Sequence, residues 1–79
     1  MTKSIFSRKY ARFRHLLVEA REASGVTQAE LALRLERPQS FVSKYERGER
    51  RLDLIEFLEI ADALGVNPIG LIRRLRETR

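Results

Sequence analysis

One proline limits the folds open to this chain, because it divides the segment from Thr27 to Gly48 into two short helical patterns. Pro38 has no backbone N–H and disfavours helix for the residue before it, so the helix that follows Thr27 must end at the corner Glu36-Arg37-Pro38. The helix after the corner is predicted from Gln39 to about Arg47, and the glycine that follows ends it. We therefore expect two short helices that meet at a tight corner.

Three further signals mark where helices begin. Thr27 with Glu30, and Asp53 with Glu56, have the spacing of a capping box, in which each side chain caps the backbone of the other residue. Asn67 precedes a proline at the first helical position, where the missing N–H costs nothing. Local chemistry thus predicts helix starts on both sides of the central corner.

The remaining pattern completes an all-α fold. A first helix is predicted from about Ser7 to Ser24, and a fourth helix runs from Asp53 until Gly65 stops it. No segment alternates apolar and polar residues long enough to predict a strand. The expected fold is a compact five-helix bundle. Its predicted inward-facing residues are Tyr10, Phe13, Leu17, Ala20 and Ser24 on the first helix, Leu31, Ala32 and Leu35 on the second, and Leu54, Phe57, Leu58, Ala61 and Leu64 on the fourth.

Length and composition exclude several classes of protein. With 79 residues the chain is expected to form one domain over 1–79, with a short basic arm at about 1–7 and a core at about 8–76. It has no cysteine and a single histidine, His15, so neither a disulfide nor a cysteine- or histidine-based metal site is expected. No apolar run approaches the ~20 residues that cross a bilayer, and the N-terminus lacks the apolar block of a secretory signal. A cytoplasmic location is predicted.

The charge is basic: 16 Lys and Arg oppose 11 Asp and Glu, which gives a net charge of +5. The surplus gathers toward the two ends of the chain. Such a balance favours a polyanionic partner. A solvated basic surface without a specific partner is the alternative, and charge alone does not separate the two.

The helix after Pro38 has two chemically different faces when it is drawn at about 100° per residue. Val42 and Tyr45 lie on the apolar side and are expected in the core, whereas Phe41 lies between the two faces and fits either the core or a thymine methyl group. The opposite arc is entirely polar. It consists of Gln39, Ser40, Ser43, Lys44 and Arg47.

This polar arc contains residue types that read the edges of bases in the major groove of double-stranded DNA. Glutamine bonds adenine at two points, lysine reaches O6 and N7 of guanine, and serine bonds bases or phosphates. An ordinary solvated helix face has a similar composition, so the arc by itself leaves both interpretations open.

The motifs together resemble the Cro and phage-repressor type of helix-turn-helix protein, the Xre-like family of bacterial and phage regulators. The resemblance covers about residues 8–72. Its matching residues are Ala20-Arg21, Gly25, Thr27-Gln28, Glu30-Leu31-Ala32, Val42-Ser43, Glu46, Gly48 and Ile60-Ala61, followed by Ala63-Leu64-Gly65-Val66. It implies a lambda-repressor-like DNA-binding domain whose third helix, about 39–47, enters the major groove. By matched position, the base readers are Gln39, Ser40, Ser43 and Lys44.

The resemblance also assigns roles outside that helix. Gln28 would meet a phosphate at the start of its helix, and Arg21 would form a structural ion pair with Glu46. If that pair were fully exposed, it would contribute less than ~1 kcal/mol. At the corner the family usually has glycine in a left-handed conformation, but this chain has Glu36, which costs about 1 kcal/mol at positive φ.

Phosphate contacts are expected from cations beside the reading helix. Arg47, Arg50 and Arg51 come at or just past its end, and Lys9 and Arg12 reach the backbone from the first helix. Each phosphate that is neutralised steepens the salt dependence of binding by about one unit of slope.

A homodimer is expected because one helix reads too few base pairs to specify a site, and proteins of this type bind half-sites ~34 Å apart. The candidate interface is the fifth helix, which has more apolar surface than a terminal helix needs; these residues also suit closure of the core. The candidate interface residues are Ile69, Gly70, Ile72 and Leu75.

The predicted function is that of a DNA-binding transcriptional regulator, most simply a repressor at a two-fold operator, in the cytoplasm and associated with the nucleoid. No catalytic set, cofactor site, metal site or small-molecule site is evident, so an enzyme is not expected. Two alternatives remain. The first is the antitoxin of a toxin–antitoxin pair, although no extra segment for gripping a toxin is visible. The second is the controller protein of a restriction–modification system, which only genomic neighbourhood distinguishes from a repressor.

Overall fold

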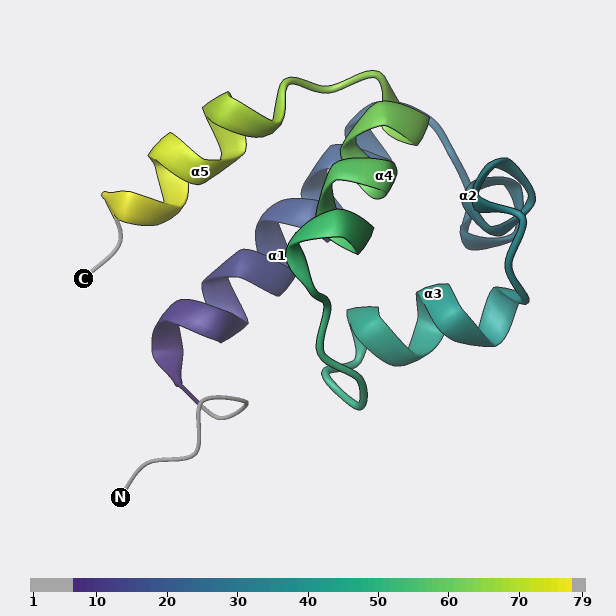
Figure 1. The fold of residues 1–79 in the computed structure, drawn as a ribbon, viewed down its shortest axis with the longest axis horizontal. Coiled ribbons are helices and arrows are strands. Elements are labelled where there is room, and N and C mark those ends of the chain that lie inside the picture. The colour runs from purple at the N-terminus through teal and green to yellow at the C-terminus, as the bar shows by residue number, and fades with distance from the viewer. Residues whose placement is uncertain (1–6, 78–79) are drawn as a thin grey trace.

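The computed structural model describes residues 7–77, and these residues form five helices and no strand (Figure 1). The helices are α1 Arg8–Ala23, α2 Gln28–Leu35, α3 Gln39–Glu46, α4 Leu54–Leu64 and α5 Pro68–Arg76. The all-α prediction is therefore confirmed. Apart from Ser7, the predicted N-terminal arm lies outside the described residues. None of the helices in residues 7–77 is long and apolar enough to span a membrane.

The predicted helix starts have the expected hydrogen bonds. The hydroxyl of Thr27 accepts a bond from the N–H of Glu30 at 3.0 Å, and the Glu30 carboxylate accepts one from the N–H of Thr27 at 2.8 Å. Asp53 and Glu56 cap α4 in the same reciprocal way. The side chain of Asn67 caps α5 at the N–H of Ile69. Local sequence thus fixes the start of three helices.

The corner between α2 and α3 forms at Glu36, which has φ 57 and ψ 43 in the left-handed region. Glu36 is the one residue other than glycine with positive φ among residues 7–77. Its backbone N–H reaches the carbonyls of the last turn of α2, and Pro38 then starts α3. The corner has the left-handed geometry that the resemblance implied, although a residue with a Cβ costs free energy there.

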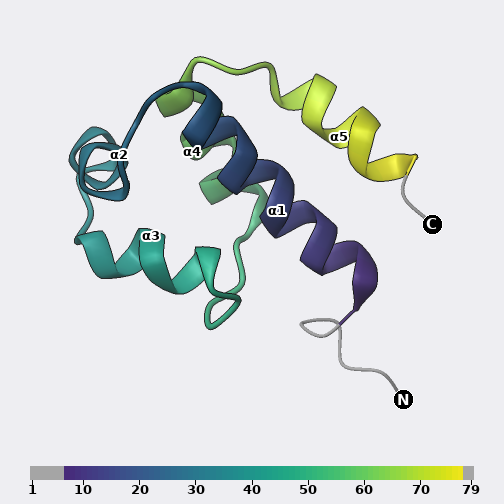
Figure 2. The ribbon, with the colours of Figure 1, turned by 180° about the vertical axis from the view of Figure 1, so that it is seen from behind.

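The core lies where α1 to α4 converge, and α5 covers one side through Leu71, which is 8% exposed. Its largest fully buried side chains are Tyr45, Leu16, Leu17, Leu31, Ile60 and Val42. Figure 1 shows α2 nearly end-on beside α3, and both views place the outer end of α5 far from that pair (Figure 2). The α2–α3 unit is therefore at one end of the molecule, and no other helix of residues 7–77 covers its outer surface.

The prediction for the inward face of α4 was partly wrong. Phe57, Ala61 and Leu64 are buried as expected, but Leu54 is 64% exposed and Leu58 is 36% exposed. Ile60, which was not predicted, is completely buried instead. The apolar residues of α4 extend around most of the helix, and the approach of the other helices selects the stripe containing Ile60. The unselected leucines form an exposed apolar surface.

Candidate nucleic-acid interface

The exposed face of α3 contains the predicted base readers. Gln39, Ser40 and Lys44 are exposed, and Ser43 is half-buried with its hydroxyl donating to the carbonyl of Ser40 at 3.3 Å. These four side chains lie at the i, i+1, i+4 and i+5 positions, so they share one side of the helix. Arg47 follows at the C-cap and is also exposed.

Two residues on the opposite side of α3 anchor the helix. Val42 and Tyr45 both have 0% exposure, in agreement with the sequence prediction. The ring of Tyr45 packs edge-on against that of Phe41, with centroids 5.6 Å apart. The close-packed core leaves the buried side chains of Val42 and Tyr45 no alternative positions. The helix is therefore held rigidly, and its other side forms a rigid surface.

Phe41, which was ambiguous in the sequence, belongs to the core at 8% exposure. Two guanidinium groups contact its ring: that of Arg37 is 4.5 Å from the centroid and that of Arg50 is 4.8 Å from it. Arg50 also donates two hydrogen bonds to Glu56, at 3.0 and 2.8 Å. Cation–π contacts and this ion pair together hold the start of α3 against α4.

A polar network ties the end of α3 to α1 and α2. The Glu46 carboxylate accepts hydrogen bonds from Nε of Arg21 at 2.7 Å and from a terminal nitrogen of the same guanidinium at 3.1 Å. The amide of Gln28 donates a third bond to Glu46 at 2.8 Å, and Arg21 donates another to the carbonyl of Val26 at 2.9 Å. The side chains of Arg21 and Glu46 are only 13% and 6% exposed.

Burial changes how the Arg21–Glu46 pair acts. The hydrogen bonding that Arg21 donates to the Glu46 carboxylate is the main cause that raises the pKa of Arg21, against the effect of desolvation. A shielded, bidentate pair is costly to break, because either partner alone would leave a charge without compensation. The pair therefore fixes the end of α3, and through Gln28 it also fixes the first turn of α2 beside the polar face.

A second contact from α1 was not predicted from the sequence. Arg14 donates to the backbone carbonyl of Glu46 at 2.7 Å, and its guanidinium passes over Gly48. Gly48 has φ +79, a conformation that favours glycine, and a Cβ there would lie 3.0 Å from Nε of Arg14, so that the arginine would have to shift slightly. Only tertiary approach brings Arg14 there, and no local spacing in the sequence signals it.

The cations predicted to contact phosphates have different surroundings. Arg47 is exposed and forms an ion pair with Glu49 at 3.0 Å. Arg51 is exposed, and its guanidinium stacks 4.2 Å from the ring centroid of Tyr10. Arg50, by contrast, is committed to Glu56 and to the carbonyl of Arg51, so its main role in the structure is support.

The predicted phosphate contacts on α1 are more peripheral. Lys9 is exposed, whereas Arg12 is half-buried. Arg12 lines a shallow surface hollow together with Arg8 and His15, on a part of α1 that also borders Glu46. These cations extend the basic surface beyond α3 without adding to the face of α3 itself.

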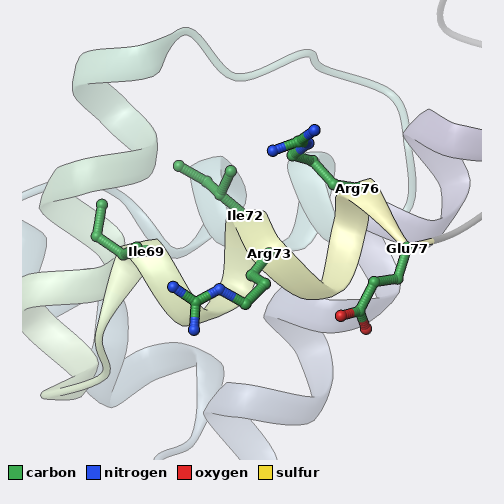
Figure 3. A pocket seen from close by; sticks show the side chains of 5 residues that line it. All are labelled: Ile69, Ile72, Arg73, Arg76 and Glu77. Atoms are coloured by element: carbon green, nitrogen blue, oxygen red, sulfur yellow. The ribbon is translucent and has the colours of Figure 1, made fainter.

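The predicted interface residues on α5 divide into two groups. Ile69 is 59% exposed and Ile72 is 38% exposed, whereas Leu75 packs against the core and Gly70 is half-buried. Figure 3 shows Ile69 and Ile72 projecting from the same side of α5, where they line a shallow pocket with Arg73, Arg76 and Glu77. Exposed isoleucines on a short terminal helix leave an apolar surface that the described chain does not cover.

Fold and site together define a helix-turn-helix protein with an exposed polar second helix, and comparison with known proteins identifies the family. A helix-turn-helix family profile matches residues 17–71, so the chain belongs to this family, of the Cro and Xre type. It is a DNA-binding transcriptional regulator and not an enzyme. Among residues 7–77 no group of three or more His, Cys, Asp or Glu side chains is placed to hold a metal ion.

Individual relatives agree with this assignment. The chain is 38% identical over 58 residues to the uncharacterized HTH-type transcriptional regulator y4dJ of Sinorhizobium fredii, covering 73% of this chain and 75% of the relative. An XRE-family like protein from Pseudomonas syringae pv. tomato superposes with a TM-score of 0.84 and 53% identity, over 86% of this chain and 83% of the other. The restriction-modification controller protein C.AhdI from Aeromonas hydrophila gives a TM-score of 0.74 and 34% identity, over 82% and 98% of the two chains.

Proposed function

We propose that the protein regulates transcription by binding a specific two-fold operator as a homodimer, with α3 in the major groove. The observation that carries this proposal is the division of α3: Val42 and Tyr45 are fully buried while Gln39, Ser40 and Lys44 are exposed. An α-helix fits the major groove, where each base pair offers a distinct pattern of donors and acceptors. The rigid polar face is therefore assigned the task of reading bases.

In this proposal the side chains that contact base edges are those of Gln39, Ser40, Ser43 and Lys44. The simplest regulatory outcome of binding is repression of transcription. Gln28 contacts a phosphate at the start of α2. One N–H of its side-chain amide is donated to Glu46, at 2.8 Å, so the other amide N–H and the free backbone N–H groups of the first turn would serve the phosphate. Arg47 and Arg51 contact phosphates beyond α3, and Lys9 and Arg12 extend the contact from α1.

Arg50 is reassigned from phosphate contact to support. Its two hydrogen bonds to Glu56 and its stacking on Phe41 leave it less able to follow a phosphate than Arg51, which is exposed. An Arg50→Ala variant should therefore lose folding stability, whereas Arg51→Ala should weaken binding to all DNA sequences alike.

The homodimer would use the apolar surface of α5. Ile69 and Ile72 are exposed there beside Arg73 and Arg76, and Leu54 of α4 is exposed as well. A two-fold interface buries the same patch on both copies and sets the separation of the two reading helices. We expect Ile72→Arg to yield monomers in sedimentation velocity with an intact helical spectrum; unchanged dimers would exclude this surface.

The controller protein of a restriction–modification system is a second candidate, because the likeness to the controller C.AhdI extends over 98% of that chain at 34% identity. In either role we propose that the protein works in the cytoplasm, in association with the nucleoid.

Selection of bound duplexes from a random DNA pool tests the proposed function. The wild type should enrich one sequence with two related halves about one helical turn apart. Lys44→Ala should bind the selected duplex about 5- to 150-fold more weakly and lose preference at one base pair, which corresponds to ~1–3 kcal/mol. Lys9→Ala is the matched control, and it should weaken selected and random duplexes equally. A wild type that enriches no sequence would refute the proposal.

A further inference from the structure

The polar arc of α3 contains no carboxylate, but the structure brings one to its end. Glu49 lies two residues beyond Arg47 in the exposed loop, and its position is fixed by the backbone. Its N–H donates to the carbonyl of Lys44 at 2.8 Å, and the N–H of Gly48 donates to the carbonyl of Tyr45 at 3.2 Å. These two bonds form a Schellman motif, which closes the helix and holds the next residue against its last turn.

The Glu49 side chain takes up one whole edge of the Arg47 guanidinium. Nε of Arg47 donates to one carboxylate oxygen at 3.0 Å, and the adjacent terminal nitrogen donates to the other oxygen, also at 3.0 Å. The two parallel bonds have the fork geometry with which arginine binds either a carboxylate or a phosphate. A DNA phosphate that approached this edge would therefore have to replace Glu49.

We propose that Glu49 is an internal competitor for Arg47 that lowers the affinity of the protein for DNA of any sequence. This inference rests on the proposed function, since it assumes that the end of α3 lies against the DNA backbone. In the free protein the Glu49 carboxylate occupies the place of a phosphate group. On binding, Arg47 exchanges one anion for another, so the contact releases less free energy than that of an unpaired arginine.

Exposure and charge make the exchange feasible. The side chains of Arg47 and Glu49 are 57% and 55% exposed, so water and salt screen the pair and its rupture costs little. The hydrogen bonds from Arg47 hold the pKa of Glu49 below its ordinary value, and the charge of Lys44 acts in the same direction. Glu49 therefore stays ionised at neutral pH and competes as a full negative charge.

A double-mutant cycle on Arg47 and Glu49 tests the proposal through the salt dependence of binding. Glu49→Gln keeps the size of the side chain and removes its charge. It should tighten binding to random duplex and to the selected duplex by the same factor, about three- to fivefold at ~50 mM salt, and steepen the plot of log K against log salt by about one unit. In the Arg47→Gln background the same change should tighten binding by less than about twofold, because the competed group is absent.

Asp62→Asn is the matched control, since it removes an exposed carboxylate from α4. Thermal melts of each variant establish that the fold is intact. The proposal is overturned if Glu49→Gln tightens binding no more than Asp62→Asn does, or by as much with Arg47→Gln as without it. It is also overturned if Glu49→Gln weakens binding to the selected duplex and relaxes one base pair, because Glu49 would then read a base directly. If the wild type enriches no sequence, the proposed function fails first, and this inference fails with it.

Discussion

Replacement of Glu46 by alanine tests how α3 is held in place. The change removes the acceptor of three hydrogen bonds, two from Arg21 at 2.7 and 3.1 Å and one from Gln28 at 2.8 Å. The guanidinium of Arg21, 13% exposed, would keep only its bond to the carbonyl of Val26. Removing one partner of a shielded pair costs about 3 kcal/mol. In a domain of this size that loss lowers Tm by roughly 12–24 °C.

Urea denaturation followed by circular dichroism, with all variants at one protein concentration, measures this cost. Glu46→Gln keeps one acceptor oxygen and should lose about half as much stability. Arg21→Met combined with Glu46→Leu removes both charges. The double variant should lose less unfolding free energy than the two single variants lose together. A loss below about 1 kcal/mol for Glu46→Ala would refute the reasoning, because the pair would then behave as an exposed one.

Three further changes probe the scaffold. Tyr45→Phe should leave Tm unchanged or raise it slightly, because the buried Tyr45 hydroxyl has no hydrogen-bond partner within residues 7–77; a loss above about 1 kcal/mol would reveal one. Glu36→Gly should stabilise the corner by about 1 kcal/mol, since Glu36 has φ 57, and a lower Tm would contradict this. Hydrogen bonding from Arg50 is the main cause that holds the pKa of Glu56 below 4.5. The ionised Glu56 carboxylate therefore contributes its full stability above that pH, and this contribution is lost as the pH falls through the lowered pKa. The difference in Tm between wild type and Glu56→Gln should accordingly shrink in acid, and a difference independent of pH would disprove it.

Features that depend on local chemistry were predictable from the sequence. The capping boxes at Thr27 and Asp53 form because both partners lie within one helical turn. The corner at Glu36 takes the left-handed conformation that the family pattern implied, despite the absence of glycine. The burial of Val42 and Tyr45 followed from helical periodicity alone.

Features that depend on how helices approach each other were not predictable in this way. Periodicity did not reveal that α4 would bury Ile60 and expose Leu54, because apolar residues extend around most of that helix. The contact of Arg14 with the last turn of α3 and that of Arg50 with Glu56 require a known tertiary arrangement. The partner of a long cationic side chain depends on the tertiary fold, so sequence position alone did not reveal that Arg50 pairs with Glu56.

The roles of the base readers remain predictions, and chemical-shift mapping by NMR tests them most directly. The labelled protein would be titrated with the duplex selected from the random pool. We expect the largest amide shifts on α3, from Gln39 to Glu46, and on the first turn of α2 at Gln28. Shifts concentrated on α4 and α5, with α3 unaffected by DNA, would contradict this expectation.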